Sequence, residues 1–175
     1  AAARKKLLHI ASVLVGYEAP DDAVLIATSG RYEFKNKGID MYVDALNRLR
    51  LHYDGEREII AFVLVPAWVT EPRADLLERL ASGESYRTPL PDPYITHTLH
   101  NMAEDKVVNQ IRYCGFPQKP ESKLKIIFVP SYLTGNDGIV DLTYYDTLIG
   151  FDATAFPSYY EPWGYTPLES IAFGV

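Results

Sequence analysis

Three short runs of almost entirely apolar residues constrain the fold of this chain more than any other feature of its sequence. They are Ala23–Thr28, Ile59–Val65 and Leu124–Val129, and each is rich in β-branched or aromatic residues. A strand that is apolar at nearly every position has to be covered on both faces, which is typical of a parallel sheet with helices on either side. Segments with helical spacing separate the runs. We therefore predict an α/β fold built on a parallel sheet with helices on both faces.

The remaining elements follow from local patterns. Helices are predicted where apolar residues recur every three or four positions, and their ends are placed at glycine or proline. The predicted helices are an amino-terminal one that ends at Gly16, Ile39–Leu49, one from Thr70 to Gly83 with Pro72 in its first turn, Glu104–Tyr113, Leu142–Ile149, and one that begins near Thr166. A last strand is predicted at Ala153–Phe156, a surface loop or a crossing segment at 84–99 and a turn at Gly135–Gly138. Neither a repeat nor a linker interrupts this alternation, so we predict one domain over residues 1–175.

The amino end admits two interpretations. Its basic start and the apolar residues that follow have the general form of a signal peptide. However, Leu7, Leu8, Ala11, Leu14 and Val15 fall on one face of a helix, so we predict an amphipathic helix instead. No apolar run approaches the roughly 20 residues that a membrane-spanning helix needs, and we expect no membrane segment.

Composition excludes several classes of protein. Hydrophobic residues make up 47% of the chain and charged residues 23%, the balance of an ordinary soluble domain. The net charge of -6 argues against nucleic acid as a main partner, but not against a small phosphorylated ligand. The single cysteine, Cys114, excludes an internal disulfide and fits a cytoplasmic location. His97 and His100 are three residues apart, yet no cysteine or carboxylate completes a zinc site, so we expect no metal.

Two segments follow strands of the predicted sheet and contain unusual residues. Ligands of open parallel sheets bind beyond the carboxyl ends of the strands, where both segments would lie. The first, Ser29–Gly38, is a glycine turn with cations at Arg31 and Lys37 just before a helix. These cations could hold a phosphate at the amino end of that helix, or they could simply be solvated. The spacing alone leaves both interpretations open.

The second segment, Pro157–Glu169, holds two glutamates of different character. Glu169 completes an apparent capping box, Thr166-Pro167-Leu168-Glu169, which would explain it without any ligand. Glu161 lies among aromatic residues, where a carboxylate is costly to bury unless a polar group meets it. Backbone amides near the start of the following helix could also hold a phosphate or a sugar oxygen. The residues that would supply these amides are Gly164, Tyr165 and Thr166.

Both segments resemble the signature stretches of the eukaryotic-type glycogen synthases and their bacterial relatives. The matching stretches are Gly30–Gly38, GRYEFKNKG, and Phe156–Pro167, FPSYYEPWGYTP. His100-Asn-Met102, the strand at Lys125–Phe128 and Tyr144 with the acidic residue that follows occur in matching order. The resemblance covers almost the whole chain, and the two long stretches are highly specific.

The resemblance implies a fold and an activity. Members of this family have two Rossmann-like domains that face a cleft, the GT-B glycosyltransferase architecture, and this chain is similar to most of the carboxyl-terminal one. They transfer glucose from UDP-glucose to the non-reducing end of an α-1,4-glucan such as glycogen, with retention of configuration and without a metal or other cofactor. We therefore expect residues 1–175 to be the donor-binding domain, truncated at its carboxyl end. The acceptor domain would be missing, and the chain alone inactive.

The resemblance also implies roles for individual residues. Arg31 and Lys37 would neutralise the donor diphosphate, as a metal does in other enzymes. Tyr144 would stack on uracil, Glu169 would reach the ribose, and Glu161 would lie at the donor glucose as the catalytic residue. Amide contacts to the donor would come from Gly164, Tyr165 and Thr166.

Two departures from the family pattern and three alternatives remain at this stage. Asp152 stands where the family has a histidine that we expect near the sugar, and the segment 66–97 is shorter than the eukaryotic insertion. A non-catalytic nucleotide-binding or assembly module would keep the same fold. A related glycosyltransferase could use ADP-glucose or another acceptor. A dinucleotide-dependent enzyme is disfavoured because the chain has neither GxGxxG nor GxxxxGK[ST].

Overall fold

The three apolar runs form the centre of a four-stranded parallel sheet in the computed structural model, which describes residues 1–175. The strands lie in the order β5-β2-β1-β6, with Val24 opposite Ile59 and Ile59 opposite Leu124. Their carboxyl ends therefore meet at one edge of the sheet, as expected for parallel strands. The bounds of the strands are β1 Val24–Ser29, β2 Ile59–Leu64, β5 Leu124–Val129 and β6 Ala153–Thr154.

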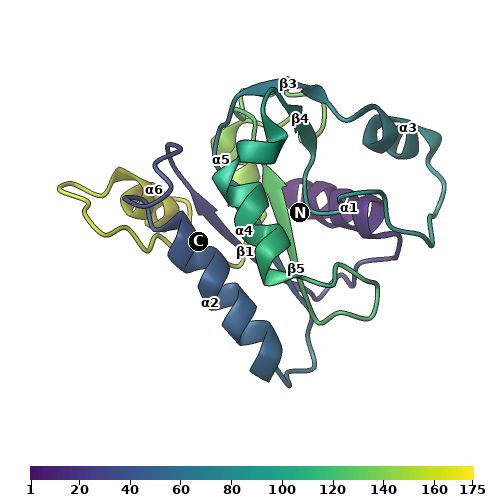
Figure 1. The fold of residues 1–175 in the computed structure, drawn as a ribbon, viewed down its shortest axis with the longest axis horizontal. Coiled ribbons are helices and arrows are strands. Elements are labelled where there is room, and N and C mark those ends of the chain that lie inside the picture. Colours follow the sequence, from purple (N-terminus) through teal and green to yellow (C-terminus); the bar gives the residue numbers. More distant parts are fainter.

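Helices cover both faces of the sheet, which confirms the predicted α/β architecture. On one face, α2 and α4 lie side by side and pack on alternate strand residues such as Ala61, Ile126 and Phe128 (Figure 1). On the other face, α1 packs on the intervening residues, such as Phe62 and Ile127, with α3 and α5 against it. These five helices are α1 Ala2–Val15, α2 Ile39–His52, α3 Ala74–Ser82, α4 Lys106–Cys114 and α5 Tyr144–Leu148.

The amino-terminal helix is part of the core, as its apolar face predicts. Leu7, Leu14 and Val15 are completely buried, and α1 ends at Gly16 in the left-handed conformation with φ 76°. A side chain at Gly16 would collide with the backbone of Thr88, so both the close approach and the positive φ require glycine. No helix here has the length and apolarity that crossing a membrane requires.

The predicted helix start at Thr70 is wrong. Residues Val69–Pro72 form a strand, β3, that pairs antiparallel with β4, His97–Leu99, and α3 begins only at Ala74. The loop prediction for 84–99 is wrong for its last part, because His97 is buried and belongs to β4. The pairing joins residues more than twenty positions apart, so no local pattern signals it.

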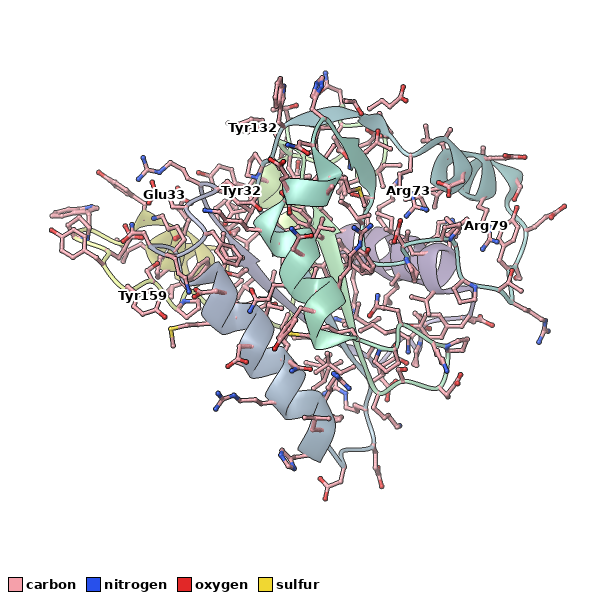
Figure 2. All side chains as sticks on the ribbon, viewed as in Figure 1. Tyr32, Glu33, Arg73, Arg79, Tyr132 and Tyr159 are labelled. Carbon is pink, nitrogen blue, oxygen red and sulfur yellow. The ribbon has the colours of Figure 1, made fainter.

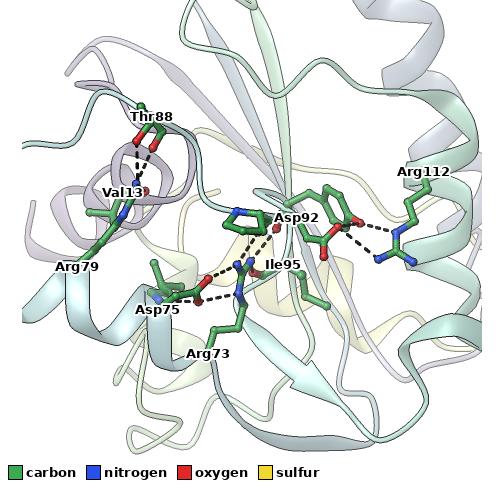
Figure 3. Close-up of polar contacts among 11 residues, drawn as sticks. Val13, Arg73, Asp75, Arg79, Thr88, Asp92, Ile95 and Arg112 are labelled. Carbon is green, nitrogen blue, oxygen red and sulfur yellow. Dashed lines mark hydrogen bonds and ion pairs between the residues drawn. The ribbon is translucent and has the colours of Figure 1, made fainter.

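One buried arginine holds this region together. The Arg73 guanidinium donates hydrogen bonds to the backbone carbonyls of Asp92 at 2.7 Å and Ile95 at 3.0 Å, and it pairs with Asp75 at 2.7 Å (Figure 3). These bonds anchor the segment before β4 against the start of α3. The sequence shows Arg73 only as one more charged residue near a proline, so its role was not predicted.

The other element boundaries shift by a few residues. A 3₁₀ turn, Met102–Glu104, precedes α4, whose first turn is capped by the Asp105 carboxylate accepting from the Val108 N–H at 2.8 Å. The last helix, α6, spans Tyr165–Ala172 and begins after Gly164, with no side-chain cap. The predicted capping box is therefore wrong. The Glu169 carboxylate instead accepts a hydrogen bond from the Tyr145 hydroxyl at 3.1 Å.

Candidate functional site

A cavity of about 810 Å³ opens at the carboxyl edge of the sheet. Its wall comes from the ends of three strands, from α5 and from the segment that leads into α6. The residues that line it are Ser29, Gly30, Arg31, Tyr32, Lys37, Leu64, Pro66, Ser131, Tyr132, Leu133, Thr134, Tyr144, Glu161, Tyr165 and Thr166. The location is where a ligand of an open parallel sheet is expected.

The two glycine- and aromatic-rich segments meet at this cavity. The N–H of Tyr159 donates to the carbonyl of Asn36 at 2.9 Å. Gly38, the residue before α2, has φ 64°, and a side chain there would collide with the Pro157 carbonyl. Glycine at position 38 therefore lets the second segment lie directly against the first. Residues more than a hundred positions apart become neighbours by this contact.

Lys37 and Glu161 form an ion pair in the wall of the cavity. The Lys37 ammonium lies 2.5 Å from the Glu161 carboxylate, and the two side chains are 14% and 26% exposed. The hydrogen bond from Lys37, its charge and a hydrogen bond from the Gly164 N–H together lower the pKa of Glu161 below its ordinary value. Glu161, for which the sequence alone suggested no structural role, is thus ionised and paired with a cation.

Arg31 stands at the mouth of the same cavity. Its side chain is 79% exposed and pairs with Glu33 at 3.0 Å. Because this contact is local and exposed, the guanidinium is held only weakly and can turn toward an anionic ligand. Arg31 and Lys37 together make one wall of the cavity cationic. Figure 2 shows Glu33 and Tyr32 of this segment on the same side of the molecule as α6.

Tyr144 lines the same cavity. Its hydroxyl is 2.7 Å from the Ser29 hydroxyl at the end of β1, and its N–H donates to the Leu133 carbonyl at 2.9 Å. Burial raises the pKa of Tyr144, so the phenol is neutral. These bonds fix the ring at the start of α5, where Thr143 caps the helix by accepting from the Asp146 N–H.

The structure brings most of the predicted site residues together. Six of the eight line the cavity: Arg31, Lys37, Tyr144, Glu161, Tyr165 and Thr166. The other two lie just behind its wall. Gly164 contacts Glu161 through its N–H, and Glu169 lies one turn along α6 beside Tyr145.

Sequence reasoning missed one complete wall of the cavity. Ser131–Thr134 follow β5, Leu64 is the last residue of β2, and Pro66 follows that strand. The signal that could have found them was available, because the rule that points to the end of β1 applies equally to every parallel strand. None of these residues is charged, so nothing in their chemistry drew attention to them.

Asp152 lies away from the cavity, which corrects the expectation that it affects a sugar site. Its carboxylate accepts from the Leu25 N–H at 2.8 Å and from the Arg4 guanidinium at 3.0 Å. Although burial opposes ionisation, these bonds lower the pKa of Asp152. Because Asp152 precedes β6 and Leu25 lies near the start of β1, the carboxylate sits at the amino edge of the sheet. There it ties α1 to the sheet.

The arrangement suits an anionic ligand that also presents a neutral polar part. Two cations and an ionised carboxylate face a space otherwise lined by tyrosines, hydroxyls and apolar groups. Residues 1–175 contain no group of three or more His, Cys, Asp or Glu side chains placed to hold a metal ion. The lysine and arginine side chains that line the cavity are Arg31 and Lys37.

Comparisons with known proteins point to one family. A sequence model described as glycogen synthase matches residues 15–87 and 76–175. A glycogen [starch] synthase of Neurospora crassa is 31% identical over 209 aligned residues, which cover 89% of this chain and 30% of that protein. Isoform 2 of the Saccharomyces cerevisiae enzyme is 31% identical, with the same coverage, and the human liver enzyme is 25% identical.

The chain spans about a third of the length of these relatives. The alignment with the Neurospora protein is longer than the 175 residues of this chain, so that relative carries additional residues inside the matched region. The two matched segments of the family model meet at 76–87. This place lies within 66–97, the segment that we expect to be shorter than its eukaryotic counterpart.

Proposed function

Because the chain belongs to the glycogen synthase family, we propose that it is the donor-binding part of a retaining glucosyltransferase. This enzyme moves glucose from UDP-glucose to the non-reducing end of an α-1,4-glucan. The observation that carries the proposal is the ion pair between Lys37 and Glu161, which joins the two long motifs in one cavity. A nucleotide sugar needs both a cation for its diphosphate and a carboxylate near its sugar, and this pair supplies one of each.

The diphosphate is assigned to Arg31 and Lys37. Arg31 can reorient because its only ion pair is exposed, and its forked guanidinium suits two phosphate oxygens. Lys37 adds a point charge deeper in the cavity, next to the amino end of α2. In this proposal, the diphosphate competes with Glu161 for Lys37. Donor binding would then leave the Glu161 carboxylate less neutralised and available to the sugar.

Glu161 is assigned to the donor glucose as the catalytic residue. In retaining transfer, positive charge develops at the anomeric carbon as the bond to the diphosphate breaks. An ionised carboxylate at that position stabilises this charge, either electrostatically or as a nucleophile. Both roles require the charged form, which the Lys37 hydrogen bond favours by lowering the pKa of Glu161.

The nucleoside is assigned to the α5 and α6 side of the cavity. Tyr144 presents a neutral, fixed ring for stacking on uracil. Glu169 lies beside Tyr145 and would accept a hydrogen bond from a ribose hydroxyl. The remaining donor contacts are assigned to backbone amides at the start of α6, from Gly164, Tyr165 and Thr166.

We further propose that residues 1–175 act as one domain of a two-domain GT-B enzyme in the cytoplasm, with the acceptor bound by another part of the protein. A transferase of this kind gains rate by closing around both substrates and excluding water. The isolated chain is therefore expected to bind UDP weakly and to transfer no glucose to glycogen.

Titration calorimetry of this chain with UDP and ADP tests the donor assignment. We expect UDP to bind and ADP to bind at least tenfold more weakly, roughly 1.4 kcal/mol. Incorporation of radiolabelled glucose into glycogen by the full-length protein tests the activity. Transfer from ADP-glucose at the same rate as from UDP-glucose would contradict the choice of donor. Glucose transfer by the isolated 175-residue chain would contradict the division into domains.

A further inference from the structure

An exposed aromatic pair lies outside the residues assigned above: Trp68 directly precedes β3, and His100 directly follows β4. The rings of Trp68 and His100 stack with centroids 4.3 Å apart and planes 29° from parallel. Trp68 is nevertheless 74% exposed, so most of its indole faces solvent. A tryptophan so exposed loses the stabilisation that burial would bring, and an exposed apolar surface of this kind often marks a binding site.

The backbone holds both rings in place. The His100 N–H donates to the Trp68 carbonyl at 3.0 Å, and the Ala67 N–H donates to the Pro130 carbonyl at 2.8 Å. Beside the rings, the hydroxyls of Thr70 and Thr98 lie 2.6 Å apart across the β3–β4 pair. The stack is thus a prepared surface and not a loose side chain. We name Trp68 and His100 the aromatic platform.

The aromatic platform adjoins the cavity. Pro66, two residues before Trp68, lines the cavity, and so does Tyr132, two residues after the Pro130 that bonds Ala67. Figure 2 shows Tyr132 at the same upper edge of the molecule as β3 in Figure 1. Tyr132 is itself 73% exposed. A ligand could therefore lie on the platform and extend toward the cavity.

The surroundings select the chemistry of that ligand. Neither 66–71 nor 97–104 contains a lysine or arginine, whereas Glu71 and Glu104 are acidic. A phosphate or a polyanion would meet no lysine or arginine in these two segments. Hydroxyl and amide groups are at hand instead, in Thr70, Thr98 and Asn101. A flat apolar ring with a neutral polar rim suits a pyranose, whose C–H face packs on an indole while its hydroxyls make hydrogen bonds.

We propose that the aromatic platform binds a glucose unit of the α-glucan chain and aligns that chain with the donor cavity. The choice of an α-glucan over other neutral sugars rests on the proposed function. The platform lies at the edge where transfer would take place, so it would hold an outlying glucose unit of the acceptor, whose reacting end is bound by the other domain, and would contribute to specificity for long chains.

Retardation of the full-length protein in native gels that contain glycogen, together with titration by maltoheptaose, tests the proposal without catalysis. Trp68→Ala should weaken the affinity for glycogen and the affinity for maltoheptaose by about tenfold each, since stacking on an aromatic ring contributes a free energy that corresponds to a change of this size. Trp68→Phe should retain most of the affinity. His100→Ala, which removes the ring beneath, should weaken binding less than Trp68→Ala. Tyr113→Ala, at an even more exposed aromatic residue on α4, is the control and should bind as the parent does.

Kinetics separate this inference from the proposed function. With UDP-glucose as donor, Trp68→Ala should raise the KM for glycogen and leave the KM for the donor unchanged. Parent-like affinity of Trp68→Ala for maltoheptaose would overturn the platform whether or not the protein transfers glucose. Parent-like affinity combined with an altered sedimentation coefficient would assign Trp68 to a contact with protein, which also overturns it. A parent that binds maltoheptaose through Trp68 but transfers no glucose would sustain the platform and refute the proposed function.

Discussion

Two lysine–glutamate pairs lie at opposite edges of the sheet, and their surroundings differ. At the amino edge, Lys125 and Glu58 are 3.0 Å apart and almost completely buried. Lys125 also donates to the Ser122 carbonyl at 2.6 Å and lies over the ring of Tyr17, whose hydroxyl donates to Glu58. Burial lowers the pKa of Lys125 even though Glu58 beside it acts in the opposite direction. Every strong bond of this pair is made within the protein.

At the carboxyl edge, the pair of Lys37 and Glu161 is incomplete. The Lys37 ammonium has three protons to donate, and its one side-chain partner is Glu161. The pair faces the cavity, where a ligand can replace either partner. The same two residue types thus serve stability where all their bonds are internal, and they are free to serve binding where some bonds are left for a ligand.

The largest expected effect is on folding, from Lys125→Met. Removing one partner of a buried pair leaves the other charge unpaired, which costs about 3–5 kcal/mol. Urea denaturation at pH 7 measures the loss. The double variant Lys125→Met/Glu58→Gln should recover part of it, because no buried charge is then left alone. If Lys37→Met destabilises the fold as much as Lys125→Met, the contrast between the two edges is wrong.

The next effect is on catalysis, from Glu161→Gln in the full-length protein. Loss of the charge at the donor glucose should lower kcat by roughly 100–1,000-fold, the range seen when one group that stabilises a transition state is removed. Stability to urea should change little, since both side chains face the cavity and are not sealed in the core. Steady-state kinetics with UDP-glucose and glycogen provide the measurement. Turnover near that of the parent would remove Glu161 from the reaction.

Binding of the diphosphate should respond to each cavity cation. Arg31→Ala and Lys37→Ala should each weaken UDP binding by about tenfold or more, since a hydrogen bond to a charged group contributes about 1.5–3 kcal/mol. Calorimetry on this chain measures the change. Lys5→Ala, an exposed lysine on α1, is the control. Equal binding by Arg31→Ala and the Lys5 control would show that Arg31 stays with Glu33.

A smaller effect concerns pH. Burial lowers the pKa of His97, although the carbonyl and carboxylate of Asp137 oppose this. The unfolded chain takes up a proton below about pH 6.5 while the folded chain keeps His97 neutral. The free energy of unfolding should therefore keep its full value above pH 6.5 and fall as the pH drops below it. The total loss is about 1.4 kcal/mol for each pH unit that separates the pKa of His97 in the unfolded chain from its lower pKa in the folded chain. Urea denaturation at pH 7.5 and 5.5 should show a drop that His97→Gln reduces.

The smallest effect is expected at Glu169. Its side chain caps no helix and makes one exposed hydrogen bond, so Glu169→Gln should change the free energy of unfolding by less than about 0.5 kcal/mol. Thermal denaturation tests this. A larger loss would mean that the Tyr145 contact contributes to folding, and the carboxyl edge would then resemble the amino edge more than we infer.

Much of the architecture could be predicted because its causes are local. Apolar runs predicted β1, β2 and β5 to within one residue, since a strand buried on both faces has to be apolar along its whole length. Periodicity predicted α1 and α2, and glycine located the end of α1. The failures at Thr70 and at the capping box have one cause. In both places a distant partner, β4 or Tyr145, competes with the local pattern.

What the sequence by itself determined is therefore the parallel sheet, its helical covering and the two segments that would bear the chemistry. These depend on residue types and on spacings within a few turns. Only the tertiary structure decided that Glu161 pairs with Lys37 and that Asp152 belongs to the opposite edge. Each of these depends on contacts between residues far apart in the chain. Such contacts exist only after the strands have aligned their ends, so no local pattern could encode them.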